Sequence, residues 1–187
     1  MDSSFRKVHE SLFVSGYEGA KEKGDKFDKI VSLASPTSST DESFVITDGE
    51  HDYSKFESAV DAVINYLDGG NTVLVNCQAG ISRSVSACIS AQVCYYDLPF
   101  VQALQNARFG HRLPNPQLLE SAERYISENY EYVEERRLKQ ESKKSVESLS
   151  QKLIEKVDQD DKIESSDRFK MHINNILSLE LDRIQKK

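Results

Sequence analysis

The chain has 187 residues, of which 38% are hydrophobic, and its formal net charge is −7. This length and apolar content allow one domain of ordinary size with an appendage. An acidic chain is poorly suited to nucleic acid or an anionic membrane surface, and no apolar run approaches the ~20 residues of a membrane span. We therefore expect neither partner and predict a cytoplasmic protein, since the residues after Met1 form no apolar stretch.

The composition changes near residue 130. Residues 1–130 hold 11 Lys or Arg against 18 Asp or Glu, whereas residues 131–187 hold 13 of each. The second stretch contains no Gly and no Pro, and its apolar residues recur at helical spacing. We predict a domain over 1–130 and a charged tail of two helices over 131–187. The apolar face of each tail helix needs a packing partner. That partner is the domain body, a second copy of the tail or another protein.

In chain order, the first informative segment is the apolar, strand-like run Phe44–Ile46, followed by the loop Thr47–Tyr53. The loop carries four Asp, Glu or His side chains. After it, apolar residues at helical spacing predict a helix. They are Phe56, Val60, Val63, Ile64 and Leu67.

A buried strand and a buried helix then follow with a short loop between them. Thr72–Val75 is an apolar, β-branched run bounded by Gly69–Asn71, which is typical of a buried strand. Ser84–Tyr96 has no Pro or Gly and is rich in small and apolar residues, as in a buried helix. Two further helices are predicted over Pro99–Arg108 and Pro116–Asn129.

The loop places Cys77 six residues before Arg83 at this strand-to-helix turn. Backbone N–H groups of such a loop converge, and the positive end of the helix dipole completes an anion site. A thiolate there is a nucleophile, and the Arg fork pairs with two phosphoryl oxygens. Ser84 can donate its hydroxyl to the sulfur. The predicted phosphate-binding residues are Gln78, Ala79, Gly80, Ile81, Ser82 and Arg83.

The loop has two other interpretations. A buried cysteine is commonly just a small hydrophobe, but the strand, the glycine, the hydroxyl after the arginine and the helix all favour a functional loop. A nucleotide-binding P-loop is excluded because the chain has no Gly-Lys-Ser/Thr. Cys88 and Cys94 are interpreted as small core residues of the helix, with a redox role, in which one of them traps an oxidised Cys77, as the alternative.

The run Cys77–Ser84 resembles the active-site loop of dual-specificity phosphatases, within the cysteine-based protein tyrosine phosphatases. The resemblance covers about residues 5–130. Leu12–Gly16 and Phe27–Leu33 resemble the family's first two strands, and Arg112–Leu119 is similar to the stretch that closes its core. One departure is Asn76, because the family has His before the nucleophile, where it supports the low pKa of the thiol.

A phosphatase also needs a proton donor for the leaving oxygen. Asp48 is our first choice, since it ends an apolar run, and the pair Asp48–Gly49 resembles the family's general-acid loop. Asp52 is the rival, although it stands where a helix N-cap is expected. Glu50 is a further alternative, and His51 is given no role.

We predict an α/β fold with a central mixed sheet flanked by helices, protein tyrosine phosphatase-like, and a C-terminal helical extension. The Cys77 loop should lie at the carboxyl end of its strand. The predicted function is hydrolysis of phosphoprotein monoesters through a cysteinyl-phosphate, with no metal and no cofactor. The loop positions between Cys77 and Arg83 hold no basic residue, which favours phosphoproteins over inositol lipids.

Two alternative functions remain. One is a catalytically weak phosphoprotein-binding module that uses the tail for interaction, suggested by Asn76 and by residues 131–187. The other is a sulfurtransferase or arsenate reductase with the same oxyanion site. Arsenate reductases of the low-molecular-weight phosphatase type have the loop near the N-terminus and the acid downstream, the reverse of the order in this chain.

Overall fold

The computed structural model describes residues 5–47 and 52–129. Its centre is a five-stranded sheet in the order β1-β2-β5-β3-β4. β1 runs antiparallel to β2, and the other neighbouring strands are parallel. The strands are β1 Phe5–His9, β2 Leu12–Ser15, β3 Lys29–Ser32, β4 Glu42–Ser43 and β5 Val73–Asn76.

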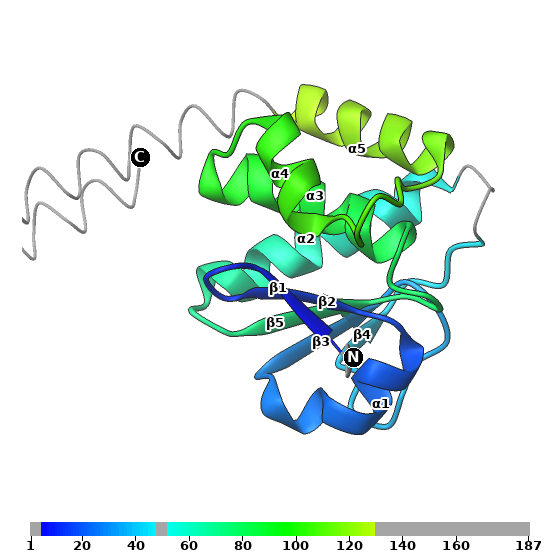
Figure 1. Ribbon diagram of the computed structural model, residues 1–187. Coiled ribbons are helices and arrows are strands. Elements are labelled where there is room, and N and C mark those ends of the chain that lie inside the picture. The colour runs from blue at the N-terminus through cyan, green and yellow to red at the C-terminus, as the bar shows by residue number, and fades with distance from the viewer. Residues whose placement is uncertain (1–4, 48–51, 130–187) are drawn as a thin grey trace, which may run out of the picture. The chain divides into compact units, whose positions relative to one another are not determined.

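Helices cover both faces of this sheet (Figure 1). α1 lies on one face, and α2 to α5 form a layer on the other, with α3 packed against α2, α4 and α5 as well as against β2 and β5. The helices are α1 Tyr17–Lys23, a short 3₁₀ turn Gly24–Lys26, α2 Tyr53–Asp68, α3 Arg83–Tyr96, α4 Phe100–Ala107 and α5 Pro116–Glu128. The predicted fold class, a mixed sheet flanked by helices, is confirmed.

The structure differs from the sequence prediction at the start of the chain and before α2. The strand β1 and the helix α1 were not predicted, so the two strands foreseen there are the second and third of this chain. Phe44–Ile46 is not a regular strand. Two of its backbone amides still donate hydrogen bonds to carbonyl oxygens at and just after the end of β3. Phe44 N donates to Ser32 O at 2.7 Å, and Ile46 N donates to Leu33 O at 3.4 Å. The apolar character of Ile46 reflects complete burial rather than strand pairing.

The two faces of the sheet bury different side chains, because successive residues of a strand point to opposite sides. On the α1 face, Ile30 and Leu74 pack with Ala20, and three phenylalanines surround them. The ring centroids of Phe5, Phe13 and Phe27 lie 5.0–6.0 Å apart. On the opposite face the buried valines and leucines of the strands meet α2 and α3.

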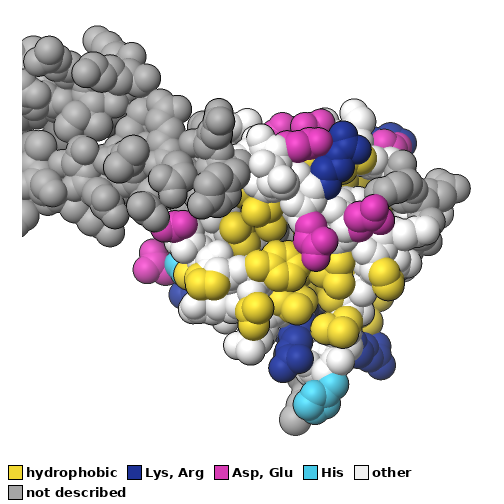
Figure 2. Space-filling view, turned by 90° about the horizontal axis from the view of Figure 1, so that it is seen from above, with side chains coloured by type: hydrophobic (Ala, Val, Ile, Leu, Met, Phe, Trp, Pro, Cys, Tyr) yellow, Lys and Arg dark blue, Asp and Glu magenta, His cyan; other side chains and the backbone are white. Residues whose placement is uncertain are grey.

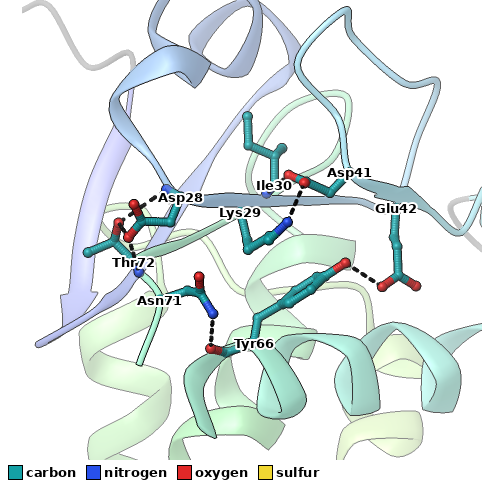
Figure 3. Close-up of polar contacts among 8 residues, drawn as sticks. All are labelled: Asp28, Lys29, Ile30, Asp41, Glu42, Tyr66, Asn71 and Thr72. Carbon is teal, nitrogen blue, oxygen red and sulfur yellow. Dashed lines mark hydrogen bonds and ion pairs between the residues drawn. The ribbon is translucent and has the colours of Figure 1, made fainter. Parts of the chain in front are cut away.

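The amino ends of the parallel strands are held by side chains (Figure 3). The Asp28 carboxylate accepts hydrogen bonds from the backbone amide of Thr72 at 2.8 Å and from its hydroxyl at 2.6 Å. Asp41 accepts from the Lys29 ammonium at 2.9 Å and from the Ile30 amide at 2.8 Å. The Asp28 contacts join the starts of β3 and β5, and the Asp41 contacts join the start of β3 to the residue before β4. Both sets help to fix the register in which these strands reach the opposite edge.

The helical layer carries apolar side chains on its outer side, as Figure 2 shows from above. α4 buries Ala103 and Ala107 against the body of the domain. The exposed large hydrophobic residues of α4 and the segment after it are Val101, Phe109 and Leu113. None of the helices among the described residues is long and apolar enough to cross a membrane.

The predicted tail over 131–187 lies outside the described residues. Its two helices, the domain boundary near 130, and its role in self-association or docking therefore stay predictions. Asp48, Gly49, Glu50 and His51 also lie outside the described residues.

Candidate active site

The Cys77 loop connects the carboxyl end of β5 to the first residue of α3, Arg83. The loop turns sharply at Gly80, whose φ of +68° lies in the left-handed region that favours glycine. A Cβ on Gly80 would also stand 2.6 Å from the backbone nitrogen of Gly16 and 2.6 Å from the carbonyl carbon of Ser15. Glycine is therefore required at position 80 both for its conformation and for the close approach of two backbones.

Hydrogen bonds converge on the sulfur of Cys77. The side chain is 1% exposed. Its Sγ accepts from the backbone N–H of Gly80 at 3.3 Å and from the hydroxyl of Ser84 at 3.2 Å. Such donors stabilise a thiolate. The structure brings the predicted nucleophile and the predicted hydroxyl donor into direct contact.

These surroundings act on the pKa of Cys77 in opposite directions. Burial raises the pKa, but the hydrogen bonds from Ser84 and Gly80 and the charge of Arg83 together lower it below the ordinary thiol value. A lowered pKa favours the thiolate form of Cys77 relative to that of an ordinary thiol.

The guanidinium of Arg83 is fixed on one side by the chain. Its Nη1 donates to the carbonyl oxygen of Ile46 at 2.7 Å and to that of Leu33 at 3.4 Å. Its Nε is buried and has no hydrogen-bond partner within the described residues. Anchoring Nη1 leaves the Nε and Nη2 side of the planar fork to bind two oxygens of an anion.

The remaining loop residues are placed around these groups. Gln78 and Ala79 are exposed, Gly80 and Ser82 are buried, and Ile81 is half-buried. The Gln78 carbonyl accepts from the first amide of α1, that of Tyr17, at 3.1 Å.

The buried Ser82 hydroxyl ties the loop to the segment before α5. Its Oγ accepts from the amide of Asn115 at 2.7 Å. This contact could not be predicted from the sequence, because Asn115 lies 33 residues from Ser82 along the chain.

Asn76 is completely buried at the end of β5, and neither polar atom of its side-chain amide has a partner among the described residues. It pairs with Ser15 of β2 and Ser32 of β3, and alternation places its side chain on the α1 face with Leu74. An Asn side chain at this position is able to hydrogen-bond the loop backbone. No such bond forms within the described part of the chain, so an unpaired side-chain amide stands directly before Cys77.

Asp52 is the N-cap of α2, the structural role that the sequence offered as the alternative to a general acid. Its carboxylate caps α2 by accepting from the amide of Lys55 at 3.2 Å, and it forms an ion pair with the Lys55 ammonium at 2.6 Å. The hydrogen bonds from Lys55 lower the pKa of Asp52. A carboxyl group held in its ionised form is a poor proton donor at neutral pH.

The other cysteines lie in the interior of α3 and are free. Burial raises the pKa of Cys88 and raises that of Cys94 to about 12. Neither thiol has the thiolate character that redox chemistry favours, which agrees with small core residues. Within the described ranges, no cluster of three His, Cys, Asp or Glu side chains is arranged to hold a metal ion.

A comparison with solved structures decides the fold family. A mouse protein described as a putative dual specificity phosphatase, solved with zinc tungstate, superimposes with a TM-score of 0.60 at 18% identity over 71% of this chain and 93% of that chain. The chain has the fold of the dual-specificity phosphatases. Human DUSP28 matches with a TM-score of 0.56 at 22% identity over 67% of this chain and 94% of its own.

A third structure and one sequence match agree with this fold. The human tyrosine phosphatase-like serine/threonine/tyrosine-interacting protein gives a TM-score of 0.56 at 19% identity, over 66% of this chain and 95% of that one. A protein of Acanthamoeba polyphaga mimivirus, named as a putative tyrosine-protein phosphatase, is 36% identical over 52 residues, which are 28% of this chain and 24% of that protein. The match therefore spans about a quarter of that relative's length. No family profile matches the sequence.

Proposed function

We propose that the chain is a metal-independent phosphatase that hydrolyses phosphotyrosine, phosphoserine or phosphothreonine esters of proteins through a cysteinyl-phosphate. The observation that carries the proposal is the pair of hydrogen bonds to the Cys77 sulfur, from Gly80 at 3.3 Å and Ser84 at 3.2 Å, at the N-terminus of α3 beside Arg83. A thiolate in an anion-binding loop is suited to attack phosphorus. The dual-specificity phosphatase fold supports the same class of reaction.

In the first step, the Cys77 thiolate attacks phosphorus and forms the S–P bond. The P–O ester bond breaks at the same time, and the departing oxygen takes the proton of Asp48. Arg83 and the loop amides bind the equatorial oxygens of the phosphoryl group. Because Ile46 and Leu33 already hold the guanidinium, little reorganisation is needed when charge develops.

In the second step, water attacks the phosphoryl group and breaks the S–P bond, releasing inorganic phosphate. The Asp48 carboxylate accepts a proton from that water and regains its acid form. The electron pair of the S–P bond returns to Cys77, where the Ser84 hydroxyl stabilises the leaving thiolate.

Chain connectivity supports Asp48 as the acid. The carbonyl of Ile46 contacts Arg83 directly, and Asp48 follows Ile46 by two residues. Asp52 is committed to the start of α2 and to Lys55.

Charge supports a protein substrate. The loop positions Gln78, Ala79, Ile81 and Ser82 add no basic group that would bind further phosphates of an inositol lipid. The net charge of −7 disfavours nucleic acid and anionic membranes as partners. We place the enzyme in the cytoplasm, acting on phosphorylated proteins.

Hydrolysis of an aryl phosphate with a metal chelator present tests the proposal. Purified protein should release phosphate, and Cys77→Ser should reduce the rate to background. Phosphopeptides with each of the three phosphorylated residues then define the specificity. Protein that binds tungstate but hydrolyses none of these substrates is instead a phosphoprotein-binding module.

The role of Asp48 is tested by the leaving group. Asp48→Asn should slow hydrolysis of phenyl phosphate far more than that of nitrophenyl phosphate, because only the poor leaving group needs protonation. Asp52→Asn is the matched control and should not show this dependence on the leaving group, because Asn caps a helix N-terminus about as well as Asp. Equal losses for both substrates with Asp48→Asn would contradict the assignment, and Glu50→Gln would be examined next.

A further inference from the structure

We propose that Arg6 is a positioning residue that sets the direction of one amide of the phosphate-binding loop. Arg6 lies on β1, far from the loop in sequence, and it is not one of the predicted site residues. The inference rests on the proposed function in that the loop binds a phosphoryl group.

One nitrogen of the Arg6 guanidinium bridges two backbone carbonyls. Nη2 donates to the carbonyl oxygen of Gly80 at 3.1 Å and to that of Ala107, the last residue of α4, at 2.9 Å. The guanidinium carbon also lies 4.9 Å from the centre of the Phe109 ring. Arg6 thus joins an edge strand, the Cys77 loop and the end of α4.

The bond to Gly80 has a consequence for the next amide. In a trans peptide the C=O and the N–H point in opposite directions. Every described peptide bond is trans. With the Gly80 carbonyl directed to Arg6, the N–H of Ile81 must point away from Arg6.

That direction is the one the loop needs. The amide of Gly80 already points to the Cys77 sulfur. If the Ile81 amide points away from Arg6, it joins the amides that converge on the anion site at the start of α3. The Gln78 carbonyl is held in the same manner by Tyr17, which directs the amide of Ala79. Arg6 and Tyr17 therefore hold alternate peptide units of the loop from outside.

The Gly80 peptide needs such an anchor because glycine is the least restricted residue of a chain. Without Arg6, the peptide unit between Gly80 and Ile81 is free to turn, and a turned peptide presents a carbonyl oxygen to the anion instead of an N–H. Phe109 packs on the Arg6 guanidinium, and the Ala107 carbonyl binds it, so the anchor itself is held in place.

Tungstate affinity, measured by calorimetry on the full chain, tests the inference. Arg6→Met keeps a side chain of similar length for Phe109 but removes the donors, and should weaken tungstate binding about tenfold, the effect of one hydrogen bond to a charged group. Arg6→Lys should fall between the wild type and Arg6→Met, because an ammonium can still donate to a carbonyl but lacks the planar guanidinium that packs against Phe109, and so holds the Gly80 carbonyl less firmly.

Two controls separate positioning from general destabilisation. Lys7→Met removes the same charge from the next residue of β1, where the side chain is exposed. Tyr95→Phe removes a hydrogen bond to the Leu67 carbonyl away from the loop, and thus lowers stability alone. Both should bind tungstate as the wild type does, although Tyr95→Phe melts at a lower temperature.

The inference is overturned if Arg6→Met binds tungstate with wild-type affinity. It is also overturned if the two control variants bind tungstate as weakly as Arg6→Met does. If Arg6→Met does not fold, Arg6→Lys decides: weaker binding supports positioning and equal binding overturns it. The proposed function is tested separately by hydrolysis. Tungstate binding that depends on Arg6 without hydrolysis refutes only the phosphatase proposal, whereas hydrolysis with no effect of Arg6 refutes only this inference.

Discussion

The two ends of the parallel strands are built in opposite ways. At the amino end, Asp28, Asp41 and Thr72 lie at the surface, and their polar atoms are matched with nearby donors and acceptors (Figure 3). At the carboxyl end, the amide of Asn76, the hydroxyl of Ser15 and the Nε of Arg83 are buried without partners in the described part of the chain.

The difference indicates which end has a stability role and which a functional one. A buried polar atom without a partner costs roughly 1–3 kcal/mol, so several of them in one place call for an explanation. An anion in the Cys77 loop explains the free Nε of Arg83 directly. The amino end helps to hold the strands in register, and under the proposed function the carboxyl end loses stability in exchange for anion binding.

The largest effect is expected at Arg83. Arg83→Lys removes the fork that binds two phosphoryl oxygens, and should lower kcat about 10²–10³-fold, as loss of an oxyanion donor does. Steady-state kinetics on an aryl phosphate measures the effect. Arg124→Lys, a change in an exposed ion pair with Glu128, is the matched control and should leave kcat unchanged.

Glycines at the two ends make the comparison direct. Gly80 and Gly70 both have positive φ, +68° and +77°, but an added Cβ meets backbone only at Gly80. Gly70→Ala should cost the ~1–2 kcal/mol of a left-handed residue. Gly80→Ala should cost more in chemical denaturation and also abolish tungstate binding. If Gly70→Ala and Gly80→Ala lose the same free energy of unfolding, the backbone around Gly80 can move away from Gly16 and Ser15 at little cost.

Ser84→Ala tests the sulfur's surroundings. Loss of the 3.2 Å hydrogen bond should raise the pKa of Cys77 toward that of an ordinary thiol, because the thiolate loses a donor. The pH dependence of alkylation by iodoacetamide reports this pKa. Ser90→Ala, on the same helix and bonded to the Ser86 carbonyl, is the control and should not shift it. An unshifted profile in Ser84→Ala would contradict the assignment.

The smallest effect is expected at the amino end. Hydrogen bonds from Thr72 lower the pKa of Asp28, so its stabilising contribution exists above the ordinary carboxyl pKa and is lost as the pH falls through the lowered value. Asp28→Asn should reduce the free energy of unfolding at pH 7. This difference should begin to decrease as the pH falls toward about 4 and should vanish only below the lowered pKa of Asp28. Asp25→Asn serves as the exposed control. A change in the kcat of Asp28→Asn would show that the amino and carboxyl ends of the parallel strands are coupled.

The sequence predicted the elements that are specified locally. β5, α3, α4 and α5 were foreseen within about two residues of their observed bounds, because apolar periodicity, Pro and Gly mark them. The Asp52 cap was recognisable from its place before an amphipathic helix. β1 and α1 gave weaker signals, since β1 carries two basic residues among its five.

By itself, the sequence determined the chemistry of the loop. Cys77, Gly80, Arg83 and Ser84 lie within eight consecutive residues, so a strand before them and a helix after them are enough to bring them together.

The tertiary structure decided which distant groups hold that loop. Arg6 reaches Gly80 across 74 positions and Arg83 reaches Ile46 across 37, through carbonyl oxygens that every residue possesses. A backbone carbonyl has no identity in a sequence, so only folding shows which one an arginine binds. The same holds for Asn76, whose lack of a partner is a property of the packed strands around it.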